Sequence, residues 1–408
     1  MRKVVITGVG LVLPSAGNTE EFWDLLTSGR TATTPIDRFP AGEYAGGHAG
    51  VVDDTALSAI PLRQRKRMDR FCALAMAAAH SALDDAGLAE EAGGPSESAA
   101  AVERTGVYLG NMYGGWEITE PSMRKLCQIG YGGVSPYIAS AWFPTAPQGQ
   151  ISINWGFKGF SKTVAADTAS GSVAVGYAAR AVAEGRADVM LAGGAEAPVT
   201  PYTYTFCHTS GRLTDGEYRP FGEGADGYRV GEGGVVFVLE AEESALARGA
   251  RPLAEIAGFA TGHAVGDDVF GTAGAEVMAH VAATALKEAG VEAGELGVVG
   301  LDAQGESAAD ATEVAALRTL LGDAAGQVPC TTAKPATGHL LGAAPVVDLL
   351  AGLLAIRKGA VPPVAAPDAA ATGLDVVTGA ARERAVRSAL VNARGADGTV
   401  AALALKAI

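Results

Sequence analysis

The chain has 408 residues, of which 48% are hydrophobic and 19% are charged, enough for a large core in two to three domains or in one duplicated unit. Its formal net charge of −14 disfavours nucleic acid as a partner, and no apolar run of about 18 residues is free of charges and helix breakers, so no membrane span is expected. The four cysteines form no CxxC pair, which argues against a metal site or a disulfide framework and favours a cytoplasmic location.

β-Strands and Ala-rich helices alternate along the first part of the sequence. In order, the expected elements are a strand at 3–10, helices at 22–29 and from about 68 to 86, a strand at 106–111, a helix at 123–130, a strand–turn–helix unit at 163–185, and strands at 187–197 and 233–241. This alternation is typical of an α/β protein whose sheets are buried between helices.

The second part of the sequence repeats this order. A strand is expected at 252–262, a helix at 276–291, a strand ending in a polar turn at 296–305, a helix at 339–359 and a hairpin at 387–406. The like order predicts an internal duplication, with one half at 1–250 and the other at 251–408.

Two groups of charged residues are interpreted as solvated surface. Asp310 and Glu313 share a face of one expected helix and are interpreted as exposed helix charges rather than as a carboxylate dyad. The other group is a basic cluster, interpreted as a solvated helix entrance, with a patch facing an acidic partner protein as the alternative. Its members are Arg63, Arg65, Lys66, Arg67 and Arg70.

The turn DTASG, at residues 167–171, joins an expected strand to the start of an expected helix. Such an elbow presents a nucleophile, because free backbone N–H groups and the helix dipole at that end favour a thiolate or an oxyanion. The sequence around this turn resembles the active-site segment of β-ketoacyl synthases, in which T-A-C-S-S-G or T-G-C-T-S-G precedes the helix.

Further segments resemble that family in the same order. They are VVITGVGLVLPSAGNTEEFWDLLTSGR at the start, PFGEGADGYRVGEGGVVFVLEA, TTAKPATGHLLGAA, and VNARGADGTVAALAL near the end. The resemblance covers essentially the whole chain. It implies a thiolase-like α/β fold in which two duplicated halves form a five-layer α/β/α/β/α stack, assembled as a dimer and needing no metal or cofactor.

The chain departs from the family at the positions that carry the chemistry. Thr168 stands where the family has its nucleophilic cysteine, Gln304 where it has the first catalytic histidine, and Ala396 where a phenylalanine gates the pocket, whereas Lys334 and His339 are retained. A hydroxyl is a much weaker acid than a thiol, and a glutamine amide cannot carry a proton through turnover. Condensation by this chain alone is therefore not expected.

The combination resembles one subfamily, the chain length factors, which are the β-partners of type II polyketide synthases. The segments GGWEITEPSMRKLCQIG, SAWFPTAPQGQISI, RLTDGEYRPF and ARGADG carry this closer likeness, although chain length factors typically have glutamine at the position of Thr168. The resemblance implies a cysteine-bearing synthase subunit as a partner, paired through strands near the elbow and the GGWEITE segment, and an acyl carrier protein bound by the complex.

The same likeness implies that Trp116, Thr119 and Met123 close the far end of the acyl tunnel. Their spacing of three and four residues would place them on one helical face. Packing of this stripe into the core is the alternative, as is usual for such patterns.

For the degenerate site, we expect the Thr168 hydroxyl to cap the following helix, and Lys334 and His339 to form a hydrogen-bonded structural pair. Gln304 is expected to be a packed, hydrogen-bonded replacement. Two other functions stay open. One is an enzyme of altered chemistry, either a malonyl decarboxylase or a threonine acyltransferase assisted by His339. The other is a homodimeric binding protein for acyl chains.

Overall fold

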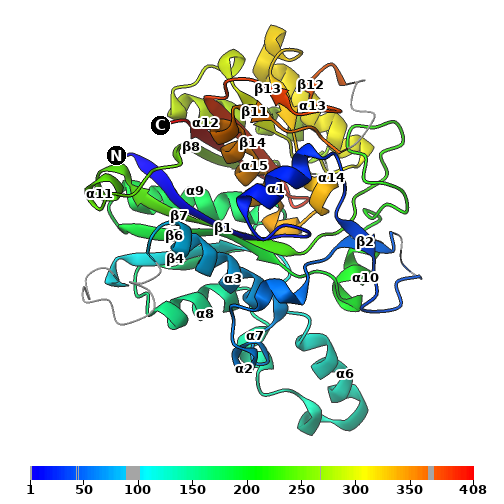
Figure 1. Ribbon diagram of the computed structural model, residues 1–408. Coiled ribbons are helices and arrows are strands. Elements are labelled where there is room, and N and C mark those ends of the chain that lie inside the picture. The colour runs from blue at the N-terminus through cyan, green and yellow to red at the C-terminus, as the bar shows by residue number, and fades with distance from the viewer. Residues whose placement is uncertain (1, 43, 45, 89–101, 267, 366–371) are drawn as a thin grey trace.

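In a computed structural model, which describes residues 2–42, 44, 46–88, 102–266, 268–365 and 372–408, the protein is built around one eleven-stranded sheet (Figure 1). The strand order is β12-β10-β9-β14-β15-β8-β1-β7-β6-β4-β5. The first half supplies β1 (Val4–Val12), β4 (Thr105–Gly110), β5 (Lys162–Val164), β6 (Val189–Glu196) and β7 (Gly233–Ala241). The second half supplies β8 (Ala254–His263), β9 (Val298–Gly300), β10 (Pro329–Thr331), β12 (Asp375–Val376), β14 (Ser388–Arg394) and β15 (Thr399–Lys406).

The two halves of the sheet have the same topology. The order β5-β4-β6-β7-β1 in one half corresponds to β10-β9-β14-β15-β8 in the other. In each half the first two pairings are parallel and the last two are antiparallel. The halves meet where β1 pairs antiparallel with β8. The duplication expected from the order of elements is therefore confirmed, and residue 250 falls between α11 (Glu242–Ala247) and β8.

Six helices complete a five-layer stack. The pair α3 (Arg70–Asp85) and α8 (Ala146–Trp155) covers the outer face of the first half, and the pair α12 (Thr272–Ala289) and α13 (Ser307–Leu321) covers that of the second. The middle layer consists of α9 (Ser170–Ala183) and α15 (Ala344–Lys358), which contact strands of both halves. The α/β/α/β/α arrangement implied by the family resemblance is confirmed.

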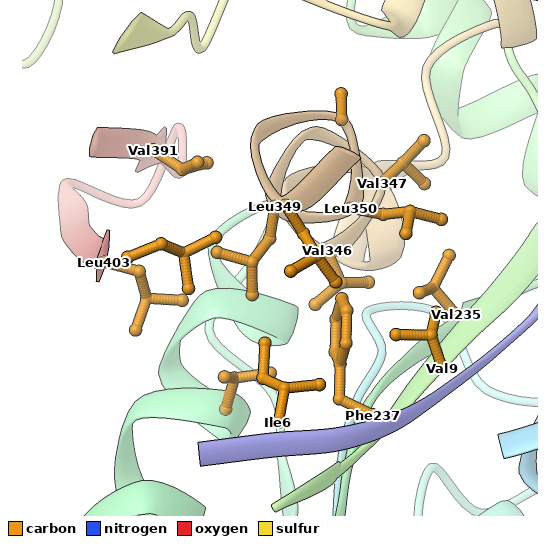
Figure 2. Close-up of a cluster of buried hydrophobic side chains, with 14 of the residues drawn as sticks. Ile6, Val9, Val235, Phe237, Val346, Val347, Leu349, Leu350, Val391 and Leu403 are labelled. Carbon is orange, nitrogen blue, oxygen red and sulfur yellow. The ribbon is translucent and has the colours of Figure 1, made fainter. Parts of the chain in front are cut away.

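Strands buried on both faces explain the continuous apolar runs in the sequence. Along β7, Val235 and Phe237 face the middle layer, while Val236 and Val238 face α3, because successive side chains of a strand point to opposite faces. Figure 2 shows Leu349 of α15 between strands of the two halves.

Strand glycines let two outer helices lie directly on the sheet. A Cβ atom on Gly10 of β1 would lie 1.9 Å from the carbonyl oxygen of Ala78 in α3. In the second half, a Cβ atom on Gly258 of β8 would lie 2.0 Å from the carbonyl oxygen of Ala285 in α12. Helix and strand backbones therefore touch, which is why alanine is frequent on the facing sides of these helices.

Shorter elements surround the stack. They are α1 (Thr19–Thr27), β2 (Thr33–Pro35), β3 (His48–Gly50), α2 (Leu62–Arg65), α6 (Thr119–Ile129), α7 (Ile138–Ala141), α10 (Pro201–Thr209), α14 (Lys334–Thr337), β11 (Ala360–Val361) and β13 (Arg382–Glu383). Figure 1 shows α6 projecting away from the sheet on the side of α2 and α7. Within the described ranges, no helix has both the length and the apolar character needed to cross a bilayer.

One member of the basic cluster was placed wrongly by the sequence analysis. Arg70 is buried, and its guanidinium donates to Asp54 (2.6 Å) and to Glu232 (2.7 Å), which also accepts from Arg38 (2.8 Å). Burial works against a charge on Glu232, but the two guanidinium groups lower the pKa of its carboxyl. Arg63, in contrast, is exposed as expected.

The contact at Gly10 can be tested by substitution. We expect Gly10→Ala to destabilise the protein by about 3 kcal/mol or more, because the added methyl group can be accommodated only by moving α3 off the sheet. Thermal melting measures this loss. Gly47→Ala is the control, since its added Cβ meets nothing within 4 Å and its melting temperature should be unchanged. Equal melting temperatures for the two variants would refute the contact.

Candidate functional site

The elbow between β5 and α9 is built by its own side chains. Asp167 has a φ of 48°, a left-handed conformation, and Ser170 holds the turn by accepting a hydrogen bond from the Ala166 N–H (2.9 Å) while its hydroxyl donates to the Asp167 carbonyl (2.5 Å). Thr168 is buried, and its hydroxyl donates to the carbonyl oxygen of Arg394, at the end of β14 (2.6 Å). The expected cap of α9 by this hydroxyl is therefore wrong, because the side chain is turned across to the other half of the sheet.

Gln304 reaches the same carbonyl from the loop after β9. Its amide nitrogen donates to Asp302 (3.0 Å) and to the Arg394 carbonyl (3.4 Å), and its amide oxygen accepts from Arg212 (3.2 Å). The side chain is buried and fully hydrogen-bonded, as expected. Thr168 and Gln304, which the resemblance implies for the nucleophile and first histidine positions, thus converge on one acceptor, the carbonyl oxygen of Arg394.

Two carboxylates on α13 hold the loop that carries Gln304. Glu313 accepts from the backbone N–H groups of Asp302 (2.7 Å) and Ala303 (2.8 Å), and Asp310 accepts from that of Gly305 (3.0 Å). Both side chains are buried, so their interpretation as solvated helix charges is wrong. Burial raises the pKa of both carboxyls, that of Asp310 to about 6.

Lys334 and His339 are both buried, but each is bonded to other partners rather than to the other. The Lys334 ammonium donates to Asp348 (2.5 Å) and to the carbonyl oxygen of Leu301 (3.2 Å). Nδ1 of His339 accepts from the Leu341 N–H (2.9 Å). The expected pair is therefore wrong, since Lys334 and His339 hold the loop through separate bonds.

His339 is electrically neutral at the site. Burial, reinforced by the charges of Lys334 and Arg212, holds the pKa of the imidazole well below its usual range. Because Nδ1 accepts a hydrogen bond, the single ring proton resides on Nε2. Among the described residues Nε2 is buried without a hydrogen-bond partner, so a donor is left free.

An ion pair adjoins Gln304 on its more exposed side, since Arg212 donates to the Gln304 amide oxygen. Arg212 is bonded to Glu306, and its guanidinium lies 5.4 Å over the ring of Phe270. These two charged side chains are 14% and 25% exposed, whereas Thr168 and Gln304 behind them are 4% and 1% exposed. We refer to the Arg212–Glu306 ion pair as the outer pair.

Ala396 lies at the rim beside the elbow. It is exposed, and its backbone N–H donates to the Asp167 carboxylate (2.7 Å), which fixes the turn between β14 and β15. Burial raises the pKa of Asp167. A methyl group at this rim cannot close a pocket in the way that a phenylalanine ring can.

The three predicted gate residues, Trp116, Thr119 and Met123, lie in different settings. Trp116 precedes α6 rather than lying on it, so the expected common helical face is incomplete. Its indole N–H donates to the Tyr113 carbonyl (2.9 Å). Thr119 is buried and its hydroxyl donates to the Gly115 carbonyl (2.5 Å), whereas Met123 is 49% exposed.

A hydroxyl nucleophile needs a bonded base for acyl transfer. The group that accepts the Thr168 proton is a backbone carbonyl, which is no base, so nothing bonded to the hydroxyl can activate it. Within the described part of the chain no cluster of three His, Cys, Asp or Glu side chains has the placement of a metal site. Sequence reasoning missed Arg212 and Arg394, although the segments RLTDGEYRPF and ARGADG that contain them had been noted.

Comparisons with known proteins match the chain over its length. The family model of the β-ketoacyl synthase N-terminal domain matches residues 1–245, and that of the C-terminal domain matches residues 253–368. A putative polyketide β-ketoacyl synthase 2 of Streptomyces halstedii is 38% identical over 99% of this chain and 97% of its own length. The tetracenomycin polyketide synthase ketoacyl synthase β subunit of Streptomyces glaucescens is 36% identical over 99% and 98%. Among solved structures, the ishigamide ketosynthase/chain length factor has a TM-score of 0.88, at 30% identity over 100% and 99% of the chains.

A cysteine at position 168 can report on the outer pair. In a Cys127→Ser background, which removes an exposed thiol, we expect Thr168→Cys to react slowly with an acyl-pantetheine thioester although α9 favours a thiolate there. Adding Arg212→Ala and Glu306→Ala should speed acylation at least about tenfold, or about 1.4 kcal/mol. Intact-protein mass spectrometry follows the reaction.

The exposed Arg219–Glu217 ion pair is the matched control, and its removal should not change the rate. Fast acylation with the outer pair intact would show that it does not cover the site.

Proposed function

The chain belongs to the β-ketoacyl synthase family, and on that premise we propose that it is the non-catalytic, chain-length-determining subunit of a two-subunit synthase that extends polyketide chains on an acyl carrier protein. One observation carries the proposal. Thr168 and Gln304 are tied to a single backbone carbonyl, while the framework around them, including Lys334 and His339, is kept. The fold is preserved for a role other than turnover.

A second subunit is supported by the exposed hydrophobic side chains between residues 123 and 206. Large hydrophobic side chains are exposed along one stretch of the chain, far more densely than scattered surface residues would be. They are Met123, Leu126, Ile129, Tyr131, Tyr137, Trp142, Phe143, Ile153, Phe160, Tyr177, Tyr202 and Phe206. Among the described residues β5 is the last strand at one end of the sheet, so its outer backbone groups are open for pairing there.

Exposed hydrophobic side chains and a sheet edge are features that an obligate protein–protein interface covers. Interfaces of that class bury more than about 2,000 Å² and resemble a protein core cut in half. The tetracenomycin relative is named as a β subunit, which supports a heterodimer with a cysteine-bearing synthase subunit. That subunit would supply the catalysis, and the acyl carrier protein would bind the complex.

Within this complex we assign chain-length control to Trp116, Thr119 and Met123. Trp116 is half-buried and Met123 is exposed, so both can contribute to a wall that the partner completes. Thr119 is buried and bonded to Gly115, and it would support that wall from behind.

One observation favours a second candidate function, malonyl decarboxylation by this chain. The free Nε2–H donor of His339 is buried, and an unpaired buried donor is costly unless a ligand or water satisfies it. Such a donor could polarise a malonyl thioester carbonyl. The outer pair argues against this candidate, because it covers the site.

Co-purification with a neighbouring synthase tests the proposed function. We expect the chain alone to aggregate because its apolar surface is open, and the co-expressed chains to form a one-to-one complex by native mass spectrometry. The complex should be acylated only on the partner's cysteine. A monodisperse monomer or homodimer of this chain, or acylation lost on Thr168→Ala, would contradict the proposal. Malonyl decarboxylation lost on His339→Ala would establish the second candidate.

Shortening Trp116 tests the assignment of the gate. We expect Trp116→Ala in the complex to lengthen the product by one or more extension units, since the missing ring leaves space for a longer chain. The cavity should cost about 3 kcal/mol of stability, or less because the side chain is only half-buried. Mass spectrometry of the released products measures the shift.

Trp23→Ala is the control, because Trp23 is also half-buried but lies on α1. It should lower stability without changing product length. An unchanged distribution from a folded Trp116→Ala, Met123→Ala double variant would place the gate elsewhere.

A further inference from the structure

Trp116 does not stand alone at the predicted gate. Its indole stacks on the ring of Tyr202, with the centroids 3.9 Å apart and the planes inclined by 24°. Tyr202 lies in the first turn of α10, in a segment that is distant from the gate residues in the sequence. Two aromatic rings in contact present one combined wall, so the space at this point depends on both side chains.

Tyr202 is held in this position by groups on both helices. Glu120, in the first turn of α6, accepts the backbone N–H of Tyr202 (3.1 Å) and the guanidinium of Arg124 (2.8 Å). Thr200 caps α10 just before it. The start of α10 is thereby fastened to the start of α6, directly after Trp116.

Two further rings close an aromatic cluster, which we define as Tyr113, Trp116, Tyr202 and Phe206. Phe206 meets Tyr202 edge-on at 5.0 Å, and Tyr113 stacks on Phe206 at 6.3 Å. Trp116 and Tyr113 are also linked directly, because the Trp116 indole N–H donates to the Tyr113 carbonyl. Each ring limits the orientations open to its neighbour.

The cluster also has an outward face. Tyr202 is 41% exposed and Phe206 is 47% exposed, which is unusual for rings packed against others. This face belongs to the stretch of exposed hydrophobic residues that we assign to the partner. The outer ring of the stack is therefore placed to contact whatever lies between the two subunits.

We propose that Tyr202 is a further specificity-determining residue, which sets product length jointly with Trp116. This inference rests on the proposed function. When only Trp116 is truncated, the Tyr202 ring is free to turn into the vacated space and restores part of the wall. The two residues should therefore act as a unit, with effects on product length that are not additive.

The test uses the complex with the partner synthase, a malonyl-loaded carrier protein and mass spectrometry of released products. We expect Tyr202→Ala to shift the products by at least one extension unit, and the Trp116→Ala, Tyr202→Ala double variant to shift them further than the sum of the single variants. Tyr202→Phe is the matched control, because it keeps the stacked ring and should give the wild-type distribution. Tyr202→Leu replaces Tyr202→Ala if that variant does not assemble.

The outcomes separate this inference from the one on which it rests. If Trp116→Ala lengthens the product while both Tyr202→Ala and the double variant add nothing, the role of Tyr202 is refuted and the proposed function stands. If the complex forms but neither residue changes product length, both the gate and the inference fail. A fall in yield at constant product length would make Tyr202 merely structural.

Discussion

Direct contact between strand and helix backbones sets the spacing of the whole stack. Where Gly10 meets Ala78 and Gly258 meets Ala285, no side chain separates the layers. Each half has such a contact between its sheet and an outer helix, so each half is thin. On the inner face a Cβ atom on Gly110 of β4 would lie 2.3 Å from the carbonyl carbon of Ser170, so the start of α9 also lies directly on the sheet, next to the elbow where Thr168 bonds to Arg394.

The degenerate site shows how catalytic positions can be reused as structure. A buried polar group must find a partner, since leaving it unpaired costs free energy. Thr168 and Gln304 meet this requirement through the Arg394 carbonyl, and the carboxylates of Asp310 and Glu313 meet it for the surrounding loop. The site therefore links the two halves of the sheet. Among the described residues some buried polar atoms do not meet this requirement, including Nε2 of His339 and Nε and Nη1 of Arg394.

Sequence patterns could predict the α/β class and the two halves because these signals are local, whereas the five-layer stack was implied by the family resemblance. Strands buried on both faces produce apolar runs, and the repeated order of elements reveals the two halves. The contacts of the site depend on which way each side chain points in the fold, and the spacing of residues in the sequence does not encode that direction. Asp310 and Glu313 share a helical face, but nothing in the sequence says that this face points inward. Arg70 was assigned to the surface because its partner Glu232 is distant in the chain, and Tyr202 escaped notice for the same reason.

The edge strand β5 and the exposed hydrophobic side chains have a consequence for the cell that makes the protein. Until another chain covers them, each newly made copy has a strand edge that can pair with other chains and an exposed hydrophobic surface that chaperones and proteases recognise. An excess of this subunit would be removed rather than stored. Natural selection should therefore favour balanced production of the two subunits, and linked translation of their genes would achieve that balance without a dedicated regulator.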